Sequence, residues 1–454
     1  MSNSQTDQGR GQNAETDAGL RSPRGALWAD IPDEKWNDWR WQLSHRLSTP
    51  EQLSQLIRLT PEEQKGVEAQ HRLRLDVTPY LASLIDADDP TCPIRRQVVP
   101  TENELAGFEA MMTDSLSEEA HSPVPGLVHR YPDRVLMLVN TQCASYCRYC
   151  TRSRIVGETK AQFSRAHHDA QIAYIADTPA VRDVLISGGD PLILPQHILE
   201  DLLRRLRAIP HVEVLRIGTR VPVFLPQRID AGLVDMLRRY HPLWMNIHVN
   251  HKRELAPEAR RACALLADAG IPLGCQSVLL AGVNDCPNVM MELVHELVRS
   301  RVRPYYLYQC DLVPGAGHFR TPVAVGIHIM EALRGHTSGF AVPTYVIDSP
   351  GGGGKVPVGP QYLISETRGR VVLRNFEGFV TTYSEPEGYR PHVSSQCPAC
   401  HSLRDEDGQA GVAALLAGDR LSIAPADYER VHHRLTRIRW RAIDLEASHK
   451  QEDE

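Results

Sequence analysis

The sequence has few cysteines and no long hydrophobic run. Ten cysteines in 454 residues are too sparse for a disulfide-stapled scaffold. No apolar run approaches the roughly 18 residues that a membrane span needs. The opening residues, MSNSQTDQGRGQNAETDAG, lack the apolar core of a signal peptide. We therefore expect a soluble, cytoplasmic protein with no membrane partner.

An excess of positive charge is also missing. The chain has 50 Lys and Arg residues against 56 Asp and Glu residues, so its formal net charge is −6. Because binding to a phosphate backbone draws on positive charge, this balance gives no reason to expect a nucleic-acid partner. Hydrophobic residues make up 42% of the chain and charged residues 23%, a globular balance that excludes wholesale disorder.

Changes in composition divide the chain into five expected segments. The first 24 residues carry almost nothing apolar and should be disordered. Farther on, Ser-Thr-Pro-Glu at 48–51 and Thr-Pro-Glu-Glu at 60–63 are typical helix starts, because a hydroxyl caps free amides and proline suits the first turn. The segments are a disordered N-terminus (1–24), a helical N-terminal domain (25–115), a partial barrel (116–340), an irregular C-terminal segment (341–430) and a charged tail (431–454).

Alternation of strand-like and helix-like stretches predicts the fold class. The expected strands cover residues 134–140, 181–187, 212–219, 245–250, 273–280 and 303–309. The expected helices cover residues 164–177, 197–208, 228–239, 256–269 and 288–300. This pattern predicts an α/β fold, a partial (β/α) barrel of about six repeats. In such folds the chemistry lies at the C-terminal ends of the strands, so a functional motif should directly follow a strand.

Three cysteines lie just after the first expected strand. Cys143, Cys147 and Cys150 have CxxxCxxC spacing, so a short loop can wrap three thiolates around one cluster. Structural zinc usually takes four ligands, whereas an iron–sulfur cluster held by three thiolates leaves one iron open for a small ligand. The alternatives are a zinc loop or three unrelated cysteines. The position after a strand favours an active site.

This motif resembles the signature of the radical S-adenosylmethionine superfamily. Further stretches are similar to the lysine 2,3-aminomutase family, and the likeness runs from about Trp28 to about His433. The stretches are His129–Arg134, Cys150–Arg152, Ser187–Asp190, Gln276–Leu280, Tyr308–Asp311 and Asp348–Lys355.

The resemblance implies a [4Fe–4S] cluster whose open iron holds S-adenosylmethionine, from which an electron supplied by a donor releases a 5′-deoxyadenosyl radical. It implies that Ser187, Gly188, Gly189 and Asp190 line the methionine moiety. Paired glycines allow close backbone approach, and a carboxylate can accept from an ammonium group. The tetrapeptide alone would fit a plain strand–loop turn. His248 and Gln276 are expected near the adenosyl group, or else are interior hydrogen-bonded residues.

A lysine follows four glycines at Gly351–Gly354. The phosphate-loop pattern fails here, because Ser349 takes its first glycine position and Val356 follows the lysine. Taken alone, the stretch would be a flexible loop with a solvated lysine. The resemblance implies instead that Lys355 holds pyridoxal 5′-phosphate as a Schiff base. Arg130 and Arg134 are expected to receive the cofactor phosphate, or otherwise to form surface salt bridges.

The resemblance also implies an amino acid substrate and an isomerase reaction. Arg152 would pair with the substrate carboxylate, and Asp311 and Asp348 would hold its distal ammonium group. Two carboxylates facing one pocket repel each other unless a cation lies between them, which favours a dibasic substrate. L-Lysine, giving β-lysine, is the first expectation, and L-arginine is the alternative. Modification of a lysine on a partner protein is less favoured, because such relatives lack the C-terminal segment.

A zinc site is the last feature that the resemblance implies. Cys286, Cys397 and Cys400 match three of four family zinc ligands, while Ser395 takes the fourth position and His392 or His401 could replace it. In the family this metal links subunits, so a homodimer or homotetramer is expected. The remaining cysteines are expected to be ordinary interior residues: Cys92, Cys263, Cys275 and Cys310.

Overall fold

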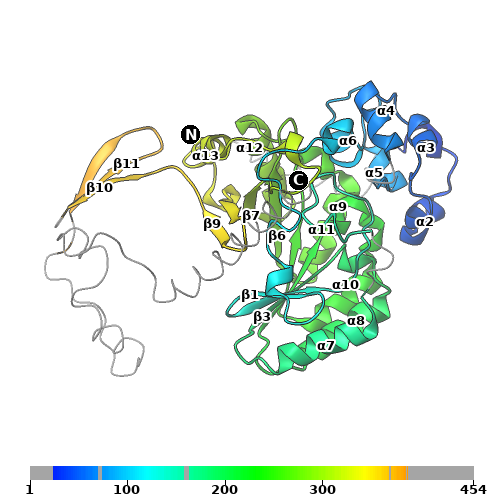
Figure 1. Cartoon of the computed structure of the whole chain (residues 1–454), viewed down its shortest axis with the longest axis horizontal. Helices are drawn as coiled ribbons and strands as arrows, with labels where there is room; N and C mark the ends of the chain where they lie inside the picture. The colour runs from blue at the N-terminus through cyan, green and yellow to red at the C-terminus, as the bar shows by residue number, and fades with distance from the viewer. Residues whose placement is uncertain (1–23, 70–73, 158–162, 368–369, 385, 387–454) are drawn as a thin grey trace, which may run out of the picture. The chain divides into compact units, whose positions relative to one another are not determined.

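The computed structural model describes residues 24–69, 74–157, 163–367, 370–384 and 386 (Figure 1). The chain divides into two compact units. The first holds residues 1–362 and 374–379, and the second holds residues 363–373 and 380–454. Within the described ranges, no helix is both long enough and apolar enough to cross a membrane.

A nine-stranded sheet forms the centre of the first unit. Its strands follow one another in chain order. Strands β2 to β8 are parallel, and β1 and β9 pair antiparallel at the two edges. The strands are β1 Leu127–Tyr131, β2 Arg134–Leu138, β3 Asp183–Ser187, β4 Val214–Thr219, β5 Leu243–Ile247, β6 Leu273–Leu279, β7 Val302–Gln309, β8 Thr344–Ser349 and β9 Gly354–Pro357. The six expected strands correspond to β2–β7, so the expected partial barrel is confirmed, and β8 continues it.

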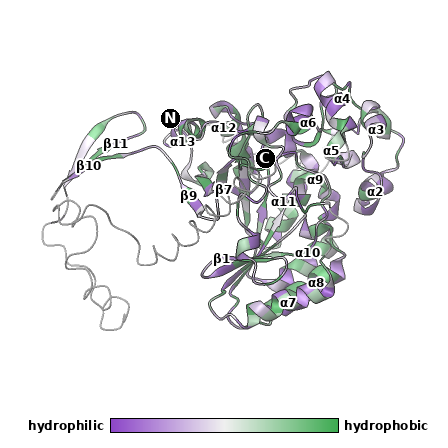
Figure 2. Ribbon diagram, in the orientation of Figure 1, coloured by the Kyte–Doolittle hydropathy of each residue, from purple (hydrophilic) through white to green (hydrophobic). Residues whose placement is uncertain are grey.

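Amphipathic helices cover the outer face of this sheet (Figure 1). Their bounds are α7 Arg165–Ala176, α8 Gln196–Arg207, α10 Ala231–Leu237, α11 Pro257–Asp268, α12 Pro287–Arg299 and α13 Val323–Leu333. In α8 the buried residues are Leu199, Leu202, Leu203 and Leu206, the spacing of one helix face. Hydrophilic and hydrophobic residues therefore mix along these helices in Figure 2. The core lies between the helices and the sheet.

Alternation along the strands decides which side chains face the helices. In β3 and β4, Val184, Ile186, Leu215 and Ile217 are fully buried, and the residues between them are less so. Successive side chains of a strand point to opposite faces, so the intervening residues face the inside of the barrel. This alternation places the Arg216 side chain on the inner wall of the barrel, where it lines a cavity.

The two edges of the sheet meet through side chains. The Tyr131 hydroxyl of β1 accepts a hydrogen bond from the backbone N–H of Lys355 in β9 at 3.0 Å. Arg130 Nε, on the neighbouring position of β1, donates to the Gly352 carbonyl. These contacts hold the edge strands together although their backbones do not form a ladder.

Short helices precede the sheet. They are α1 Asp33–Trp36, α2 Trp39–Ser44, α3 Pro50–Ser54, α4 Pro61–Glu68, α5 Pro79–Ser83 and α6 Pro93–Val98. One further short helix, α9 Val221–Phe224, comes later in the chain, directly after β4. The two expected helix starts are confirmed, because the Thr49 and Thr60 hydroxyls cap α3 and α4 and a proline opens each helix. These helices share one continuous hydrophobic core with the barrel.

The second unit contains a three-stranded sheet. Its strands are β10 Leu363–Thr367, β11 Arg370–Arg374 and β12 Val380–Ser384, in that order.

A buried ion pair anchors the N-terminal helices. Arg95 of α6 donates from Nε and Nη2 to the Glu63 carboxylate of α4, at 2.8 and 2.6 Å, and both side chains are buried. Removing one partner of a buried pair leaves the other charge without compensation.

We expect Glu63→Gln to lower the free energy of unfolding by about 3–5 kcal/mol in chemical denaturation. Lys65→Ala is the control, since it breaks an exposed pair with Glu102 and should change it by less than about 1 kcal/mol. Equal effects of the two changes would contradict this expectation.

Candidate active site

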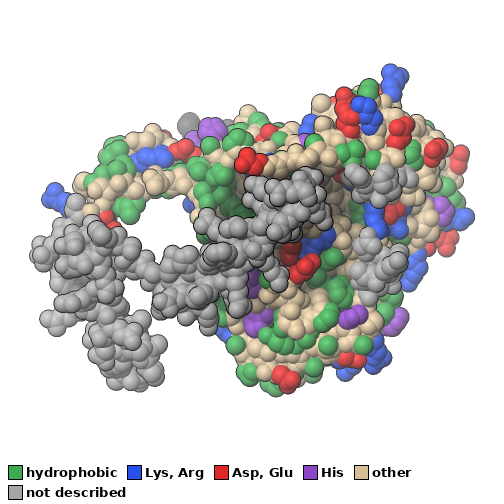
Figure 3. All heavy atoms as spheres, in the orientation of Figure 1, with side chains coloured by type: hydrophobic (Ala, Val, Ile, Leu, Met, Phe, Trp, Pro, Cys, Tyr) green, Lys and Arg blue, Asp and Glu red, His purple; other side chains and the backbone are tan. Residues whose placement is uncertain are grey.

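The cysteine loop begins directly after β2, as the strand-end rule requires. Cys143, Cys147 and Cys150 are partly buried and line a cavity of about 290 Å³. The other walls of this cavity come from the C-terminal ends of β3 to β8. Figure 3 shows acidic and basic side chains at the bottom of a hollow on the face in view.

The donor set of the loop fits an iron–sulfur cluster. Burial raises the pKa of Cys150 to about 11 and that of Cys143 well above its usual range, with neighbouring thiols adding to both shifts. Thiolates in this loop therefore need a positive partner, which a metal centre provides. In the described part of the chain no three His, Cys, Asp or Glu side chains are placed to hold a single metal ion. Thiolates of a cluster bind separate iron atoms, so they lie farther apart than ligands of one ion.

The Ser187–Asp190 turn packs against the start of the cysteine loop. The N–H of Gly189 donates to the Asn140 carbonyl at 2.8 Å, and the N–H of Asp190 donates to the Gln142 carbonyl at 2.7 Å. A Cβ at Gly189 would lie 2.0 Å from the Gln142 carbonyl oxygen, and Gly188 has a φ of +135°. Both glycines are therefore required by close backbone approach.

The Asp190 carboxylate is used within the protein. It accepts from the Thr219 hydroxyl at 2.7 and 2.8 Å, and from the N–H groups of Arg220 and Leu192 at 2.7 and 3.0 Å. Burial raises the pKa of Asp190 to about 6 in spite of these hydrogen bonds. The side chain thus ties the end of β3 to the end of β4. The expectation that it accepts from a methionine ammonium stays a prediction.

His248 and Gln276 both line this cavity. Burial, followed by the charge of Arg220, lowers the pKa of His248 well below its usual range, so the imidazole is neutral. Its Nε2 lies 2.9 Å from the Tyr149 hydroxyl. Gln276 donates from Nε2 to the Tyr308 hydroxyl at 3.2 Å and lines both this cavity and its neighbour.

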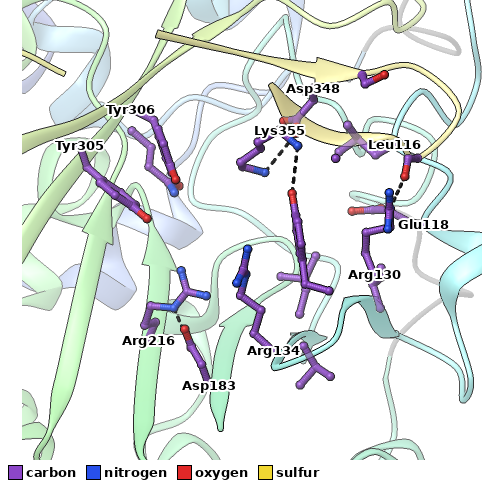
Figure 4. Close-up of a pocket in the computed structure, with 18 residues that line it drawn as sticks. Leu116, Glu118, Arg130, Arg134, Asp183, Arg216, Tyr305, Tyr306, Asp348 and Lys355 are labelled. Carbon is purple, nitrogen blue, oxygen red and sulfur yellow. Dashed lines mark hydrogen bonds and ion pairs between the residues drawn. The ribbon is translucent and has the colours of Figure 1, made fainter. Parts of the chain in front are cut away.

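The neighbouring cavity, of about 400 Å³, surrounds Lys355 (Figure 4). Lys355 lies opposite Asp348 in the β8–β9 hairpin, and its Nζ is 3.1 Å from Asp348 Oδ1. Gly351, Gly352 and Gly354 have φ values of +75°, +81° and +85°, so the turn of this hairpin needs glycine.

Three arginines line the cavity around Lys355. They are Arg130, Arg134 and Arg216, and the last forms an ion pair with Asp183 at 2.8 Å. Several guanidinium groups suit a phosphate, and a primary amine suits an aldehyde, so this donor set fits pyridoxal 5′-phosphate. Sequence reasoning missed Arg216. The sequence feature that could have identified it is a charged residue between two apolar residues of an expected strand.

Arg152, Asp311 and Asp348 contribute to the wall of the first cavity, and Lys355 lies at the junction of the two. Burial, with the Asp348 carboxylate adding to it, raises the pKa of Asp311 to about 7. Arg152 Nη2 forms an ion pair of 2.7 Å with Glu118, a buried residue that sequence reasoning also missed. The geometry thus brings the four expected catalytic residues together.

The expected zinc ligands are only partly within the described chain. Cys286 is exposed at the N-terminal end of α12. The other residues of this expectation lie outside the described residues: Cys397, Cys400, Ser395, His392 and His401. The cysteines expected to be interior are buried, which confirms that prediction: Cys92, Cys263, Cys275 and Cys310.

A methyl group at Gly189 tests how tightly the turn fits. We expect Gly189→Ala to weaken S-adenosylmethionine binding at least tenfold, because its Cβ must displace the backbone at Gln142. Equilibrium binding to anaerobically reconstituted protein measures this. Gly232→Ala, in α10, is the control, because its Cβ would meet only the far end of Asp230 at 3.4 Å. Unchanged binding in Gly189→Ala would rule out a close fit of the turn.

Two family models match the sequence. The model described as Radical SAM superfamily matches residues 137–294, which include the cysteine loop and the Ser187–Asp190 turn. The model described as Lysine-2,3-aminomutase matches residues 330–453, which include the β8–β9 hairpin and Lys355.

Curated relatives match nearly the whole chain. The L-lysine 2,3-aminomutase of Acetoanaerobium sticklandii is 54% identical over 410 residues, covering 90% of this chain and 98% of that protein. The L-lysine 2,3-aminomutase of Clostridium subterminale is 54% identical over 408 residues, covering 90% and 97%. A glutamate 2,3-aminomutase of Clostridioides difficile is 42% identical over 372 residues, covering 82% and 88%. The chain therefore belongs to the lysine 2,3-aminomutase family of radical S-adenosylmethionine enzymes.

Proposed function

We propose that this enzyme is an isomerase that moves the 2-amino group of L-lysine to C3 and so produces β-lysine. The observation that carries the proposal is the distribution of charge in the two adjoining cavities. Arg152 provides a cation for an amino acid carboxylate, and Asp311 and Asp348 provide anions for a second amino group. Two relatives at 54% identity carry the name L-lysine 2,3-aminomutase, which supports the same substrate.

Membership of the family implies a [4Fe–4S] cluster and S-adenosylmethionine. When bound, these two supply the radical that removes hydrogen from C3, and pyridoxal 5′-phosphate supplies the carbonyl carbon to which the moving nitrogen stays attached. Cys143, Cys147 and Cys150 would hold the cluster. Lys355 would hold pyridoxal through its amine, with Arg130, Arg134 and Arg216 at the phosphate.

Arg152 and its partner orient the carboxylate end of the substrate. Arg152 gives Nε and Nη2 to Glu118, at 2.9 and 2.7 Å, which leaves Nη1 for the substrate carboxylate. A planar guanidinium held on one edge presents its other edge in a defined direction. Glu118 therefore positions Arg152.

Asp311 and Asp348 discriminate between side chains. Lys355 Nζ pairs with Asp348 in the structure, so a substrate ammonium at this carboxylate replaces the lysine ammonium. A glutamate side chain would bring a third carboxylate to this pair, and the repulsion would be unfavourable in a buried site. The pair therefore favours a cationic side chain, as in lysine or arginine.

A substrate screen tests the proposal. The enzyme is reconstituted anaerobically with iron, sulfide, S-adenosylmethionine and pyridoxal 5′-phosphate, reduced, and incubated separately with L-lysine, L-arginine and L-glutamate. We expect β-lysine from lysine and no turnover of glutamate. Turnover of arginine without turnover of lysine would overturn the substrate assignment.

Single substitutions test the two carboxylates. We expect Asp311→Asn and Asp348→Asn each to raise the KM for L-lysine by roughly 30-fold or more, because about 2 kcal/mol is lost when a buried charge pair loses one partner. Asp201→Asn is the control, because Asp201 lies in the covering helix α8 and, among the described residues, pairs with Arg204 and Arg205 of that helix. A KM unchanged in both active-site variants would exclude them from ammonium recognition.

Binding of L-lysine should depend on pH. The pKa of Asp311 is raised to about 7, so the carboxyl is protonated below that pH and must lose its proton to pair with an ammonium group. The Kd of L-lysine should therefore increase as the pH falls below about 7, by up to tenfold per unit, and level off above it. Calorimetric titration on both sides of pH 7 measures this. Asp311→Asn should bind weakly with a flat profile, and a slope that survives in it would assign the titration to another group.

A further inference from the structure

Arg220 lies directly after β4 and is buried beside the cysteine loop. Its Nη1 donates to Cys147 Sγ at 2.8 Å and to the Tyr149 hydroxyl. Its Nη2 donates to Gln97 Oε1 at 2.6 Å and to Glu254 Oε2 at 2.8 Å. Four of the five guanidinium donors are therefore used within the protein, and Nε is buried without a hydrogen-bond partner.

The partners of Arg220 are themselves held in place. Glu254 is fully buried and also accepts from Gln97 Nε2 at 3.0 Å and from the N–H groups of Asn250 and His251 at 3.0 and 2.9 Å. Asn250 Nδ2 donates to the Tyr149 hydroxyl at 2.6 Å. A guanidinium held by such a network presents its Nη1 in a fixed direction.

The positive charge of Arg220 explains how its contact with Cys147 could affect a cluster. Glu254 alone would neutralise Arg220, yet the guanidinium also donates to a cysteine sulfur. Hydrogen bonds and positive charge at a cluster sulfur stabilise the reduced cluster more than the oxidised one, because reduction adds a negative charge.

We propose that Arg220 is a positioning residue for the Cys147 thiolate and that its hydrogen bond to Sγ raises the reduction potential of the cluster. The inference rests on the proposed role of Cys147 as a cluster ligand. Arg220, at the end of β4, thus acts on the metal centre without being one of its ligands.

Redox titration followed by electron paramagnetic resonance tests the proposal, with dithionite as the one-electron reductant and the iron and sulfide contents measured for each variant. We expect Arg220→Met to make reduction at least tenfold less favourable, a shift of about 59 mV to more negative potential for one electron. Arg220→Lys keeps the charge and loses the guanidinium fork, so its shift should have the same sign and be smaller. Glu254→Gln removes a negative charge near the centre, so the potential should shift the opposite way.

A control variant and a measurement without S-adenosylmethionine distinguish an effect of Arg220 on the cluster from a general effect of a buried arginine and from binding of S-adenosylmethionine. Arg95→Lys is the matched control, because Arg95 is a buried, bidentate partner of Glu63 whose hydrogen bonds go to Glu63 and to backbone carbonyls, and it should leave the potential unchanged. The shifts should appear without S-adenosylmethionine. A shift that requires S-adenosylmethionine would assign Arg220 to that molecule and overturn the proposal.

The possible failures are distinguishable. Wild-type protein that holds no cluster would contradict the proposed site itself. Variants of Arg220 that hold a full cluster at the wild-type potential would overturn the inference and leave the site intact. Loss of the cluster in both Arg220 variants, with full occupancy in Arg95→Lys, would support the positioning role.

Discussion

The structure depends on the way its nine-stranded sheet brings its two edges together. The parallel strands β2–β8 place their C-terminal ends around one cavity, and the Tyr131 hydroxyl then joins β1 to the backbone of Lys355 in β9. A second contact, from Arg130 Nε to the Gly352 carbonyl, also joins the two edges. Lys355 lies where the cavity of the cysteine loop meets the cavity of the three arginines.

Four cationic side chains that line these cavities form ion pairs. Glu118 holds Arg152, Asp348 holds Lys355, Asp183 holds Arg216 and Glu254 holds Arg220. Pairing keeps buried charges tolerable and fixes the direction of each side chain, because an unpaired ion would be strongly destabilised there. Asp311 is the exception in its electrostatics. Burial, with the Asp348 carboxylate adding to it, raises the pKa of Asp311 to about 7.

Much of the fold could be predicted from local pattern. Strand-like stretches that alternate with helix-like stretches predicted strands β2–β7, and threonine followed by proline predicted the starts of α3 and α4. The cysteine spacing and the resemblance together predicted the catalytic set around Lys355. Glu118, Arg216 and Arg220 could not be predicted in this way, because each is one charged residue in an unremarkable stretch of sequence. Their roles arise from partners 34 residues away in the pairs Arg152–Glu118 and Arg220–Glu254, and 33 away in Arg216–Asp183.

The sequence by itself determined the elements and the reactive groups: the period of two in the strands, the period of 3.6 in the helices, three thiols in one loop and a lysine after glycines. These are properties of neighbouring residues, and short-range sterics and hydrogen bonding are enough to produce them. Only the tertiary structure decided which charges meet. The Asp190 carboxylate accepts hydrogen bonds from the Thr219 hydroxyl and from the N–H of Arg220, and Cys147 Sγ accepts one from the Arg220 guanidinium. Such pairings depend on strand order and on burial, which arise when distant segments pack around one core.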